Sequence, residues 1–243
     1  MKKVIEVKNL FYTYSNGLFK LNDINFEIYE NETIGIIGAN GAGKTTLILN
    51  LNGILKGNGL IKIFDMELNN ENIRKIRKKL QIVFQNPDDQ LFSPTVFEDV
   101  SFGPLNLGLY KDDVLKRVEE ALEKVDMTEY KYYFPDHLSF GEKKKISIAT
   151  ILSMKPEIII FDEPTIGLDP YSRKNIVNII NTLEGTKIIA SHDLDIIYKL
   201  CDRVILLNKG KIIKIGLKDD ILKDKILLEE NNLEVPLTAL INF

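Results

Sequence analysis

The chain has 243 residues, of which 44% are hydrophobic and 28% charged; this is enough apolar side chain for a sizeable core and excludes a disordered or fibrous protein. Its formal net charge of -3, from 32 basic and 35 acidic residues, gives no electrostatic reason to expect nucleic acid as a partner. One cysteine (Cys201) and two histidines (His137 and His192) exclude an internal disulfide and speak against a metal centre built on them. No apolar run approaches the ~20 residues that cross a bilayer and no secretory signal opens the chain, so we expect a soluble intracellular protein that could still attach to a membrane.

Strand patterns dominate the first part of the chain. β-Branched and aromatic residues run over residues 4–14 up to a turn signal at 15–17, and apolar and polar residues alternate over 24–29. A short apolar run at 33–37 leads into a glycine-rich turn, after which we expect a helix over 44–55. Two further strands are predicted at 60–64 and 82–84, with a basic helix at 71–79 between them.

The pattern becomes helical between residue 97 and about residue 155, and the apolar residues of 113–125 recur with the spacing of one helix face. Strand patterns then return at 158–161, 187–190 and 204–207, the last joined to 212–215 by a hairpin signal. Strands that alternate with helices at both ends of the chain predict an α/β fold with a parallel, doubly wound sheet, into which the helical stretch is inserted. Residues 217–243 are amphipathic and are expected to form a C-terminal appendage.

A glycine-rich loop follows the apolar run at 33–37. Its sequence, Gly38-Ala39-Asn40-Gly41-Ala42-Gly43-Lys44-Thr45, fits the pattern G-x-x-x-x-G-K-[ST]. Glycines let backbone N–H groups turn around phosphate oxygens, and the N-terminus of the next helix directs partial positive charge at the same anion. We expect Lys44 to reach the outer phosphates and Thr45 to offer its hydroxyl to Mg²⁺. A chance glycine-rich turn would not stand between a strand and a helix, so the loop, with Thr46, predicts a bound nucleoside triphosphate.

Two acids, Asp162 and Glu163, end the apolar strand predicted at 158–161. A buried strand that ends in a solvated acidic turn is common, but in a chain with a phosphate loop this pattern indicates the Mg²⁺-side strand of a P-loop ATPase. Asp162 would then hold Mg²⁺ through water, and Glu163 would face the γ-phosphate and orient or deprotonate the attacking water. Both reach the site only if the strand ends there, because adjacent strand residues point to opposite faces.

A third motif, Leu138-Ser139-Phe140-Gly141-Glu142, precedes three consecutive lysines. On its own it has two interpretations. Ser139 and Glu142 fit a capping box, followed by the buried face of an ordinary helix. The other interpretation is a nucleotide-contacting signature, and only the order of the motifs along the chain decides between them.

Six motifs occur in one order: the phosphate loop, Gln85 after a strand, Leu-Ser-x-Gly, the strand that ends in Asp-Glu, Gly167-Leu168-Asp169, and Ser191-His192-Asp193. In this order they resemble the ATP-binding cassette (ABC) ATPases over roughly residues 1–216. The resemblance implies a P-loop NTPase core with a mostly parallel sheet, an antiparallel β subdomain, and a helical subdomain inserted at about residues 86–155.

The resemblance also implies roles for single residues. Tyr14 is similar to the aromatic residue that stacks on adenine, an interaction worth about 1–3 kcal/mol; Tyr12 is a rival, and a core aromatic is the alternative. Gln85 resembles the glutamine that contacts Mg²⁺ and the attacking water. Glu163 corresponds to the general base and His192 to the γ-phosphate sensor.

The signature is expected to act across a dimer. Ser139 and Gly141 would bind the γ-phosphate of an ATP held by a second subunit, and Asp169 would lie along that dimer seam. The sequence departs from the family's usual L-S-G-G-Q, since Phe140 replaces the first glycine and Glu142 the glutamine. Ser139 and the backbone of Gly141 remain, whereas Glu142 adds negative charge near the phosphates.

A narrower resemblance follows Gln85. Residues 83–109, the Phe140 variant and the tail at 232–237 look like the ATPase subunits of energy-coupling-factor transporters, which import cobalt, nickel or vitamins. This implies a peripheral subunit at the cytoplasmic face of the cell membrane, with ATP and Mg²⁺ as cofactors. It would form an ATP-sandwich homodimer or heterodimer on integral membrane subunits, docked through the segment at 86–109. Those membrane subunits would carry any metal, because this chain has too few histidines and cysteines.

Other classes of function stay open. An ATPase with the same cassette that works away from membranes, such as an Fe–S cluster assembly ATPase, would share these motifs, as would a different ABC importer. No sustained heptads of a chromosome-type ATPase occur. A non-enzymatic adaptor that only binds nucleotide is the second class, and the presence of Glu163 and His192 argues against it.

Overall fold

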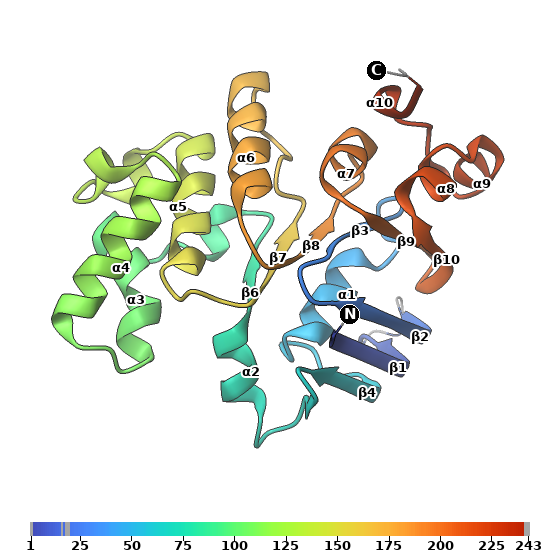
Figure 1. Ribbon diagram of the computed structural model, residues 1–243, viewed down its shortest axis with the longest axis horizontal. Coiled ribbons are helices and arrows are strands. Elements are labelled where there is room, and N and C mark those ends of the chain that lie inside the picture. Colours follow the sequence, from blue (N-terminus) through green and yellow to red (C-terminus); the bar gives the residue numbers. More distant parts are fainter. Residues whose placement is uncertain (1, 16, 18–19, 241–243) are drawn as a thin grey trace. The chain divides into compact units, whose positions relative to one another are not determined.

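The computed structural model describes residues 2–15, 17 and 20–240. Asn16 of the predicted turn and the last three residues of the predicted appendage lie outside this range. The chain divides into two compact units (Figure 1): the first comprises Met1–Arg77 with Glu184–Phe243, and the second comprises Lys78–Leu183. Each unit is described by itself below.

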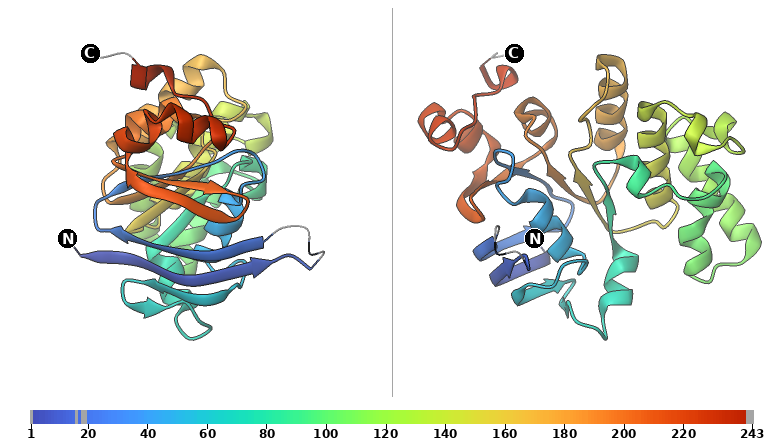
Figure 2. Two further views of the ribbon diagram at one scale, coloured as in Figure 1. Left: turned by 90° about the vertical axis from the view of Figure 1, so that its right-hand side faces the viewer. Right: turned by 180° about the vertical axis from the view of Figure 1, so that it is seen from behind.

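The first unit contains an antiparallel sheet with the strand order β2-β1-β4-β5. Its strands are β1 (Lys3–Thr13), β2 (Lys20–Tyr29), β4 (Asn58–Ile63) and β5 (Met66–Glu67). β1 and β2 run side by side as the long pair in the left view of Figure 2, in register from Lys3 opposite Tyr29 to Thr13 opposite Lys20. Apolar side chains at alternate positions bury one face of this sheet, which is why Ile5, Ile28 and Ile63 are fully buried.

The same unit contributes four strands to a second sheet, in the order β10-β9-β3-β8. β3 (Thr33–Ile37) pairs in parallel with both β8 (Thr186–Ala190) and β9 (Arg203–Asn208). All residues of β3 are buried, as expected for a central parallel strand that reads as a continuous apolar run. β10 (Lys211–Leu217) returns antiparallel to β9 through the predicted hairpin.

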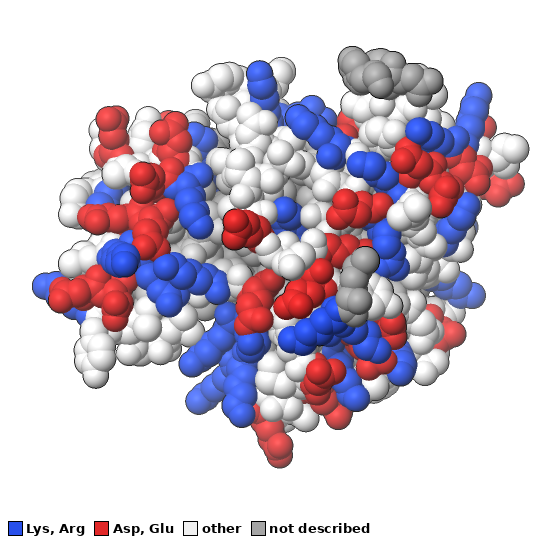
Figure 3. Space-filling view, in the orientation of Figure 1, with Lys and Arg blue, Asp and Glu red and all other residues white. Residues whose placement is uncertain are grey.

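The helices of the first unit are α1 (Lys44–Leu51), α7 (Leu194–Leu200), α8 (Lys218–Leu222), α9 (Lys225–Glu230) and α10 (Leu237–Leu240). α1 ends before the predicted residue 55 because Gly53 takes a left-handed φ of 68°. Arg77 stabilises this end by donating hydrogen bonds to the backbone oxygens of Asn52 and Gly53, at 3.2 Å each. Arg77 belongs to α2 (Ile73–Lys79), in which only Ile76 is buried, so lysine and arginine side chains gather over this helix in Figure 3.

In the second unit β6 (Leu80–Val83) pairs in parallel with β7 (Ile158–Asp162). The predicted helical stretch forms three helices, α3 (Val96–Asn106), α4 (Lys111–Lys124) and α5 (Phe140–Leu152), which lie side by side in Figures 1 and 2. α6 (Pro170–Thr182) follows β7. Thr95 and Glu98 start α3 with a capping box, so the helix boundary is fixed locally. Over the described ranges, no helix is both long and apolar enough to cross a bilayer.

Candidate functional site

The predicted phosphate loop joins the buried strand β3 to α1 in the first unit. Gly38 and Gly43 have φ values of 154° and 114°, which favour glycine. A Cβ added to Gly38 would lie 2.2 Å from the backbone oxygen of Leu207 on β9, so the loop is pressed against the sheet there. A Cβ at Gly41 would meet no atom within 4 Å, so the opposite side of the loop has room for a ligand.

Most side chains at the start of α1, which follows the loop, are buried, whereas Thr45 is exposed. Lys44 is 7% exposed, and its Nζ donates a hydrogen bond to the backbone oxygen of Gly38 at 2.9 Å. The Lys44 ammonium therefore lies over the predicted phosphate loop. The hydroxyl oxygens of Thr46 and Tyr14 are 3.1 Å apart, and the ring of Tyr12 packs edge-on against that of Tyr14 with centroids 5.0 Å apart. Of the two tyrosines proposed for adenine, Tyr14 is thus the one with a hydrogen bond to α1.

His192 lies in the short loop between β8 and α7. The N–H of Ser191 donates to the backbone oxygen of Ile36 on β3 at 3.1 Å, and the N–H of Asp193 donates to the Ser191 hydroxyl at 3.0 Å. Asp193 in turn accepts from Ile196 at 3.3 Å and caps α7. These bonds fix the histidine loop beside the strand that leads into the phosphate loop. A cavity of about 650 Å³ is lined by Asn40, by the exposed His192 and by the tail segment 232–237.

The tail is attached at both ends of that segment. Asn208 at the end of β9 donates to the side-chain oxygen of Asn231 at 2.8 Å. Thr238 donates to Asp195 of α7 twice, from its N–H at 2.9 Å and from its hydroxyl at 2.8 Å. The appendage therefore forms a fixed wall of the cavity that contains the predicted γ-phosphate sensor.

In the second unit β7 ends at Asp162, which is 3% exposed. Glu163 is 6% exposed and takes a left-handed φ of 43°, a conformation that costs of order 1–3 kcal/mol for a residue other than glycine. The strand thus ends at the acidic pair, which is necessary if both carboxylates are to reach one site. Gln85 follows β6, and because β6 and β7 are parallel, Gln85 and the acidic pair lie at the same edge of this sheet.

Ser139 and Glu142 begin α5 with a complete capping box. The Ser139 hydroxyl donates to the Glu142 carboxylate at 2.7 Å, and the Glu142 N–H donates back to the Ser139 oxygen at 3.3 Å. The hydrogen bonds that the Glu142 carboxylate accepts from the hydroxyl and the N–H of Ser139 lower the pKa of Glu142. The capping interpretation of the motif therefore holds locally, and it gives Glu142 a role: its charge satisfies the helix N-terminus.

The other two residues predicted for the dimer seam are also placed by helix ends. A Cβ at Gly141 would lie 2.7 Å from the Ser172 hydroxyl, so α5 and α6 approach closely at this point. Asp169 caps α6 by accepting hydrogen bonds from the N–H groups of Tyr171 and Ser172, at 2.9 and 3.0 Å. Phe140 lies 3.3 Å from where a Cβ of Gly167 would stand, which places this variant residue against the Gly-Leu-Asp loop.

Residues 21–166 match the ABC transporter family. The chain belongs to this family. It is 49% identical to the energy-coupling factor transporter ATP-binding protein EcfA of Methanothermobacter thermautotrophicus, over 97% of this chain and 78% of that protein. It is 47% identical to the EcfA of Carboxydothermus hydrogenoformans, over 98% of this chain and 89% of that protein.

Solved structures of ABC proteins share the fold. The cbiO1 protein of Clostridium perfringens, described as part of the ABC transporter complex cbiONQ, is similar with a TM-score of 0.83, 38% identity and 98% coverage of both chains. A dimeric ATP-binding cassette in a post-hydrolysis state with ADP and Pi gives a TM-score of 0.79 at 26% identity, over 88% of this chain and 98% of that chain. The predicted α/β ABC ATPase fold and both resemblances are confirmed. As an ABC ATPase the chain binds and hydrolyses ATP, which removes the non-enzymatic adaptor.

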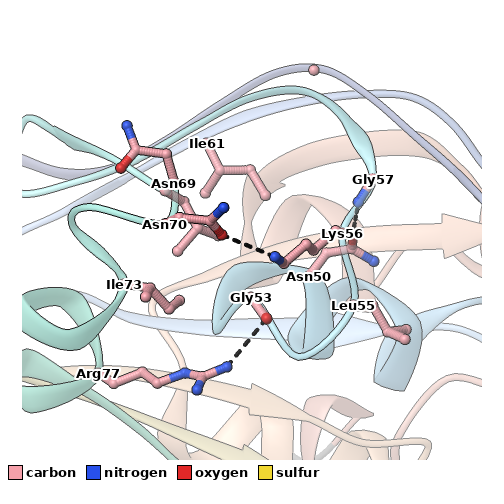
Figure 4. Close-up of a pocket in the computed structure, with 12 residues that line it drawn as sticks. Asn50, Gly53, Leu55, Lys56, Gly57, Ile61, Asn69, Asn70, Ile73 and Arg77 are labelled. Atoms are coloured by element: carbon pink, nitrogen blue, oxygen red, sulfur yellow. Dashed lines mark hydrogen bonds between the residues drawn. The ribbon is translucent and has the colours of Figure 1, made fainter.

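A second cavity of this ABC ATPase lies at the C-terminal end of α1 and has a volume of about 350 Å³ (Figure 4). Its polar side chains bond to one another or to the backbone: Asn50 donates to the Thr46 oxygen at 2.8 Å, and Lys56 donates to Asn70 at 3.0 Å. None of the predicted nucleotide-site residues lines it. We therefore interpret this cavity as a structural one beside α1 and not as part of the nucleotide site.

Sequence reasoning missed Lys144, a fully buried lysine of α5 in the second unit. Its Nζ donates to the backbone oxygens of Phe84 and Gln85, at 2.7 Å each. Burial lowers the pKa of Lys144 to about 8, while the charges of Asp162 and Glu163 act in the opposite direction. A signal existed, because Lys144 stands at i, with Ser147, Ile148 and Ile151 at i+3, i+4 and i+7 on the buried face of the helix.

Proposed function

We propose that this chain is the ATP-hydrolysing subunit of an importer of the energy-coupling-factor type, held peripherally at the cytoplasmic face of a membrane. The observation that carries the proposal is the 49% identity to an EcfA protein over 97% of this chain. The similarity to cbiO1, a part of a transporter complex, supports the same assignment over 98% of the chain. The imported solute in this proposal is a small one, a cobalt or nickel ion or a vitamin, and it is handled by the membrane subunits.

In the first unit the phosphate loop binds the ATP phosphates. Lys44 places its ammonium over the loop, and Thr45, an exposed residue, follows it in the chain. Tyr14 stacks on the adenine ring, and its hydrogen-bond contact with Thr46 keeps it beside α1. His192 senses the γ-phosphate from a loop that is bonded to β3, the strand that carries the phosphate loop.

In the second unit Glu163 is the general base and Gln85 orients the attacking water. Asp162 is the metal-side carboxylate. Mg²⁺ takes hard oxygen ligands together with substrate phosphates, and the Thr45 hydroxyl, the Asp162 carboxylate and the Gln85 amide oxygen are each of this kind. When bound, Mg²⁺ supplies charge neutralisation on the β- and γ-phosphate oxygens.

ATP drives association of two such chains, identical or not. Ser139 and Gly141 of one chain bind the γ-phosphate held by the other through charge-assisted hydrogen bonds, each worth about 1.5–3 kcal/mol, and Asp169 lies along the seam. Because these bonds require the γ-phosphate, ATP has the differential affinity that shifts the equilibrium toward the closed dimer. Hydrolysis removes the shared group and the dimer reopens.

A docking surface for the membrane subunits is proposed on the segment at residues 86–109. Phe92, Phe102 and Leu105 are 67%, 50% and 57% exposed, and the rings of Phe92 and Phe102 pack edge-on with centroids 4.9 Å apart. The buried Asp99 accepts hydrogen bonds from the N–H groups of Phe92 and Ser93, at 3.1 and 2.9 Å, and so orders the turn that presents Phe92. Grouped exposed aromatics of this kind suit an apolar helix of a partner.

The test is isolation of the complex with its membrane subunits, followed by ATPase and transport assays on Glu163→Gln. We expect this variant to bind ATP, to form a trapped dimer and to lose turnover, because the amide cannot accept the proton of water. A normal hydrolysis rate would remove Glu163 as the base. Purification with Fe–S scaffold proteins in place of membrane subunits would overturn the importer assignment.

A further inference from the structure

The loop that carries Gln85 is attached to α5 by side chains at three positions. At its start, Lys144 donates to the backbone oxygens of Phe84 and Gln85 at 2.7 Å each. At its end, the Gln90 amide donates to the Ser147 oxygen at 2.7 Å and lies 2.8 Å from the Thr150 hydroxyl. The side-chain oxygen of Gln90 also accepts from the N–H of Phe84 at 3.1 Å, which closes the loop on itself.

The third attachment lies on the surface. The Lys143 ammonium is 2.8 Å from the carboxylate of Asp88, in the middle of the loop. The Asp88 side chain is 59% exposed, so this pair contributes little to stability. Lys144 differs because it is fully buried and its partners are backbone oxygens next to β6.

A buried ammonium is an expensive way to hold two carbonyl groups. Removing a charge from water is costly, and replacing a buried charge together with its partner by apolar residues of similar volume often leaves stability unchanged. Stability alone therefore gives little reason for a lysine at position 144. An apolar side chain, however, cannot hold the backbone oxygens of Phe84 and Gln85 in place. These two oxygens lie on either side of the Gln85 Cα, from which its side chain extends.

We propose that Lys144 is a positioning residue that joins the Gln85 loop to α5, so that Gln85 and the signature at the N-terminus of α5 move as one body. The inference rests on the proposed function and deepens it. A partner that pulls on the loop at residues 86–109 would, through Lys144, displace Ser139 and Gly141 as well. The same bond would transmit the state of the γ-phosphate from the signature back to the docking surface.

The experiment uses the whole transporter complex with three variants of this chain. Lys144→Met keeps the length of the side chain and removes the donors, and Lys144→Arg keeps the donors. Lys145→Met is the matched control: it makes the same charge change at the adjacent position of α5, where the side chain is partly exposed. Thermal unfolding, nucleotide affinity, kcat, KM and solute imported per ATP hydrolysed are measured for each.

We expect Lys144→Met to unfold at a somewhat lower temperature, because two backbone oxygens lose their donor, and to bind nucleotide normally, because the phosphate loop belongs to the other unit. Its kcat should fall ~10- to 100-fold, the loss that accompanies a misplacement of about 1 Å in a catalytic group, with import per ATP lower still. Lys144→Arg should restore part of both, and Lys145→Met should match the wild type. Equal kcat and coupling in Lys144→Met and the wild type would overturn the inference.

Two further outcomes can be distinguished: a Lys144→Met variant that does not fold, and a failure of the proposed function itself. If Lys144→Met does not fold, Gln90→Leu removes the neighbouring attachment and should lower kcat and coupling in the same way; unchanged values would again overturn the inference. If the wild-type complex itself hydrolyses no ATP, or if no membrane subunits are found, the proposed function fails and not the role of Lys144.

Discussion

The phosphate loop offers a direct test of how tightly it is packed against the sheet. Gly38→Ala would bring a Cβ within 2.2 Å of the Leu207 oxygen and 2.9 Å of the Ala42 Cβ, distances at which the backbone has to shift. Overpacking of this kind costs about 1–3 kcal/mol, and the φ of 154° adds about 1–3 kcal/mol for a residue other than glycine. Gly41→Ala, at a φ of 77° and with no atom within 4 Å, should cost only the left-handed conformation, about 1–2 kcal/mol.

Denaturant unfolding of the nucleotide-free protein measures both variants without the complication of a ligand that touches the loop. The expected result is a loss of about 2–6 kcal/mol for Gly38→Ala against about 1–2 kcal/mol for Gly41→Ala. Nucleotide affinity should fall steeply in Gly38→Ala, because a shift of about 1 Å misaligns the N–H groups of the loop. Equal destabilisation by the two variants would refute the argument from close packing.

Three other predictions concern the phosphate loop, the signature and the buried cysteine. Lys44→Ala should lose most of its ATP affinity, because the buried ammonium over the loop is gone; calorimetric titration with ATP would show this, and wild-type binding would contradict the phosphate-loop assignment. Ser139→Ala combined with Gly141→Asp should leave nucleotide binding to the monomer intact and prevent ATP-driven dimerisation, which gel filtration at saturating ATP measures; a dimer that still forms would remove the proposed contact in trans. Burial raises the pKa of the Cys201 thiol well above its usual range. Alkylation by iodoacetamide should therefore be slow in the folded protein, at every pH at which it stays folded, and fast in denaturant. Rapid labelling of the folded chain would show that the core around Cys201 opens.

The sequence supports the most detailed predictions where the chemistry is local. A phosphate loop needs its glycines, its lysine and its flanking strand and helix within one short segment, so the sequence contains the whole argument. The end of α1 was predicted too late although Gly53, which ends it, is visible in the sequence; the stabilising hydrogen bonds from Arg77 come from a helix after two further strands. Glu142 was ambiguous because a capping box and a variant signature use the same residues, and only the geometry shows that the cap is formed.

Side-chain contacts between residues far apart in the chain could not be predicted from the sequence. Lys144 stands among three lysines that look alike, yet one faces Asp88 at the surface, one is fully buried on the loop backbone, and one is partly exposed. The tail attachment between Thr238 and Asp195 joins residues that no motif connects. The roles assigned to the site residues stay predictions until the variants described here are measured.

The capping box of the signature has a consequence for how readily the proposed dimer closes. The Ser139 hydroxyl has one proton, and Glu142 already accepts it at 2.7 Å. An incoming phosphate oxygen therefore competes with an internal carboxylate for that proton, and binding exchanges one strong acceptor for another. A signature with glutamine in place of Glu142 would present a neutral competitor. This chain should accordingly require a higher ATP concentration for closure than its Glu142→Gln variant and should release its partner sooner, which favours rapid cycling over a long-lived closed state.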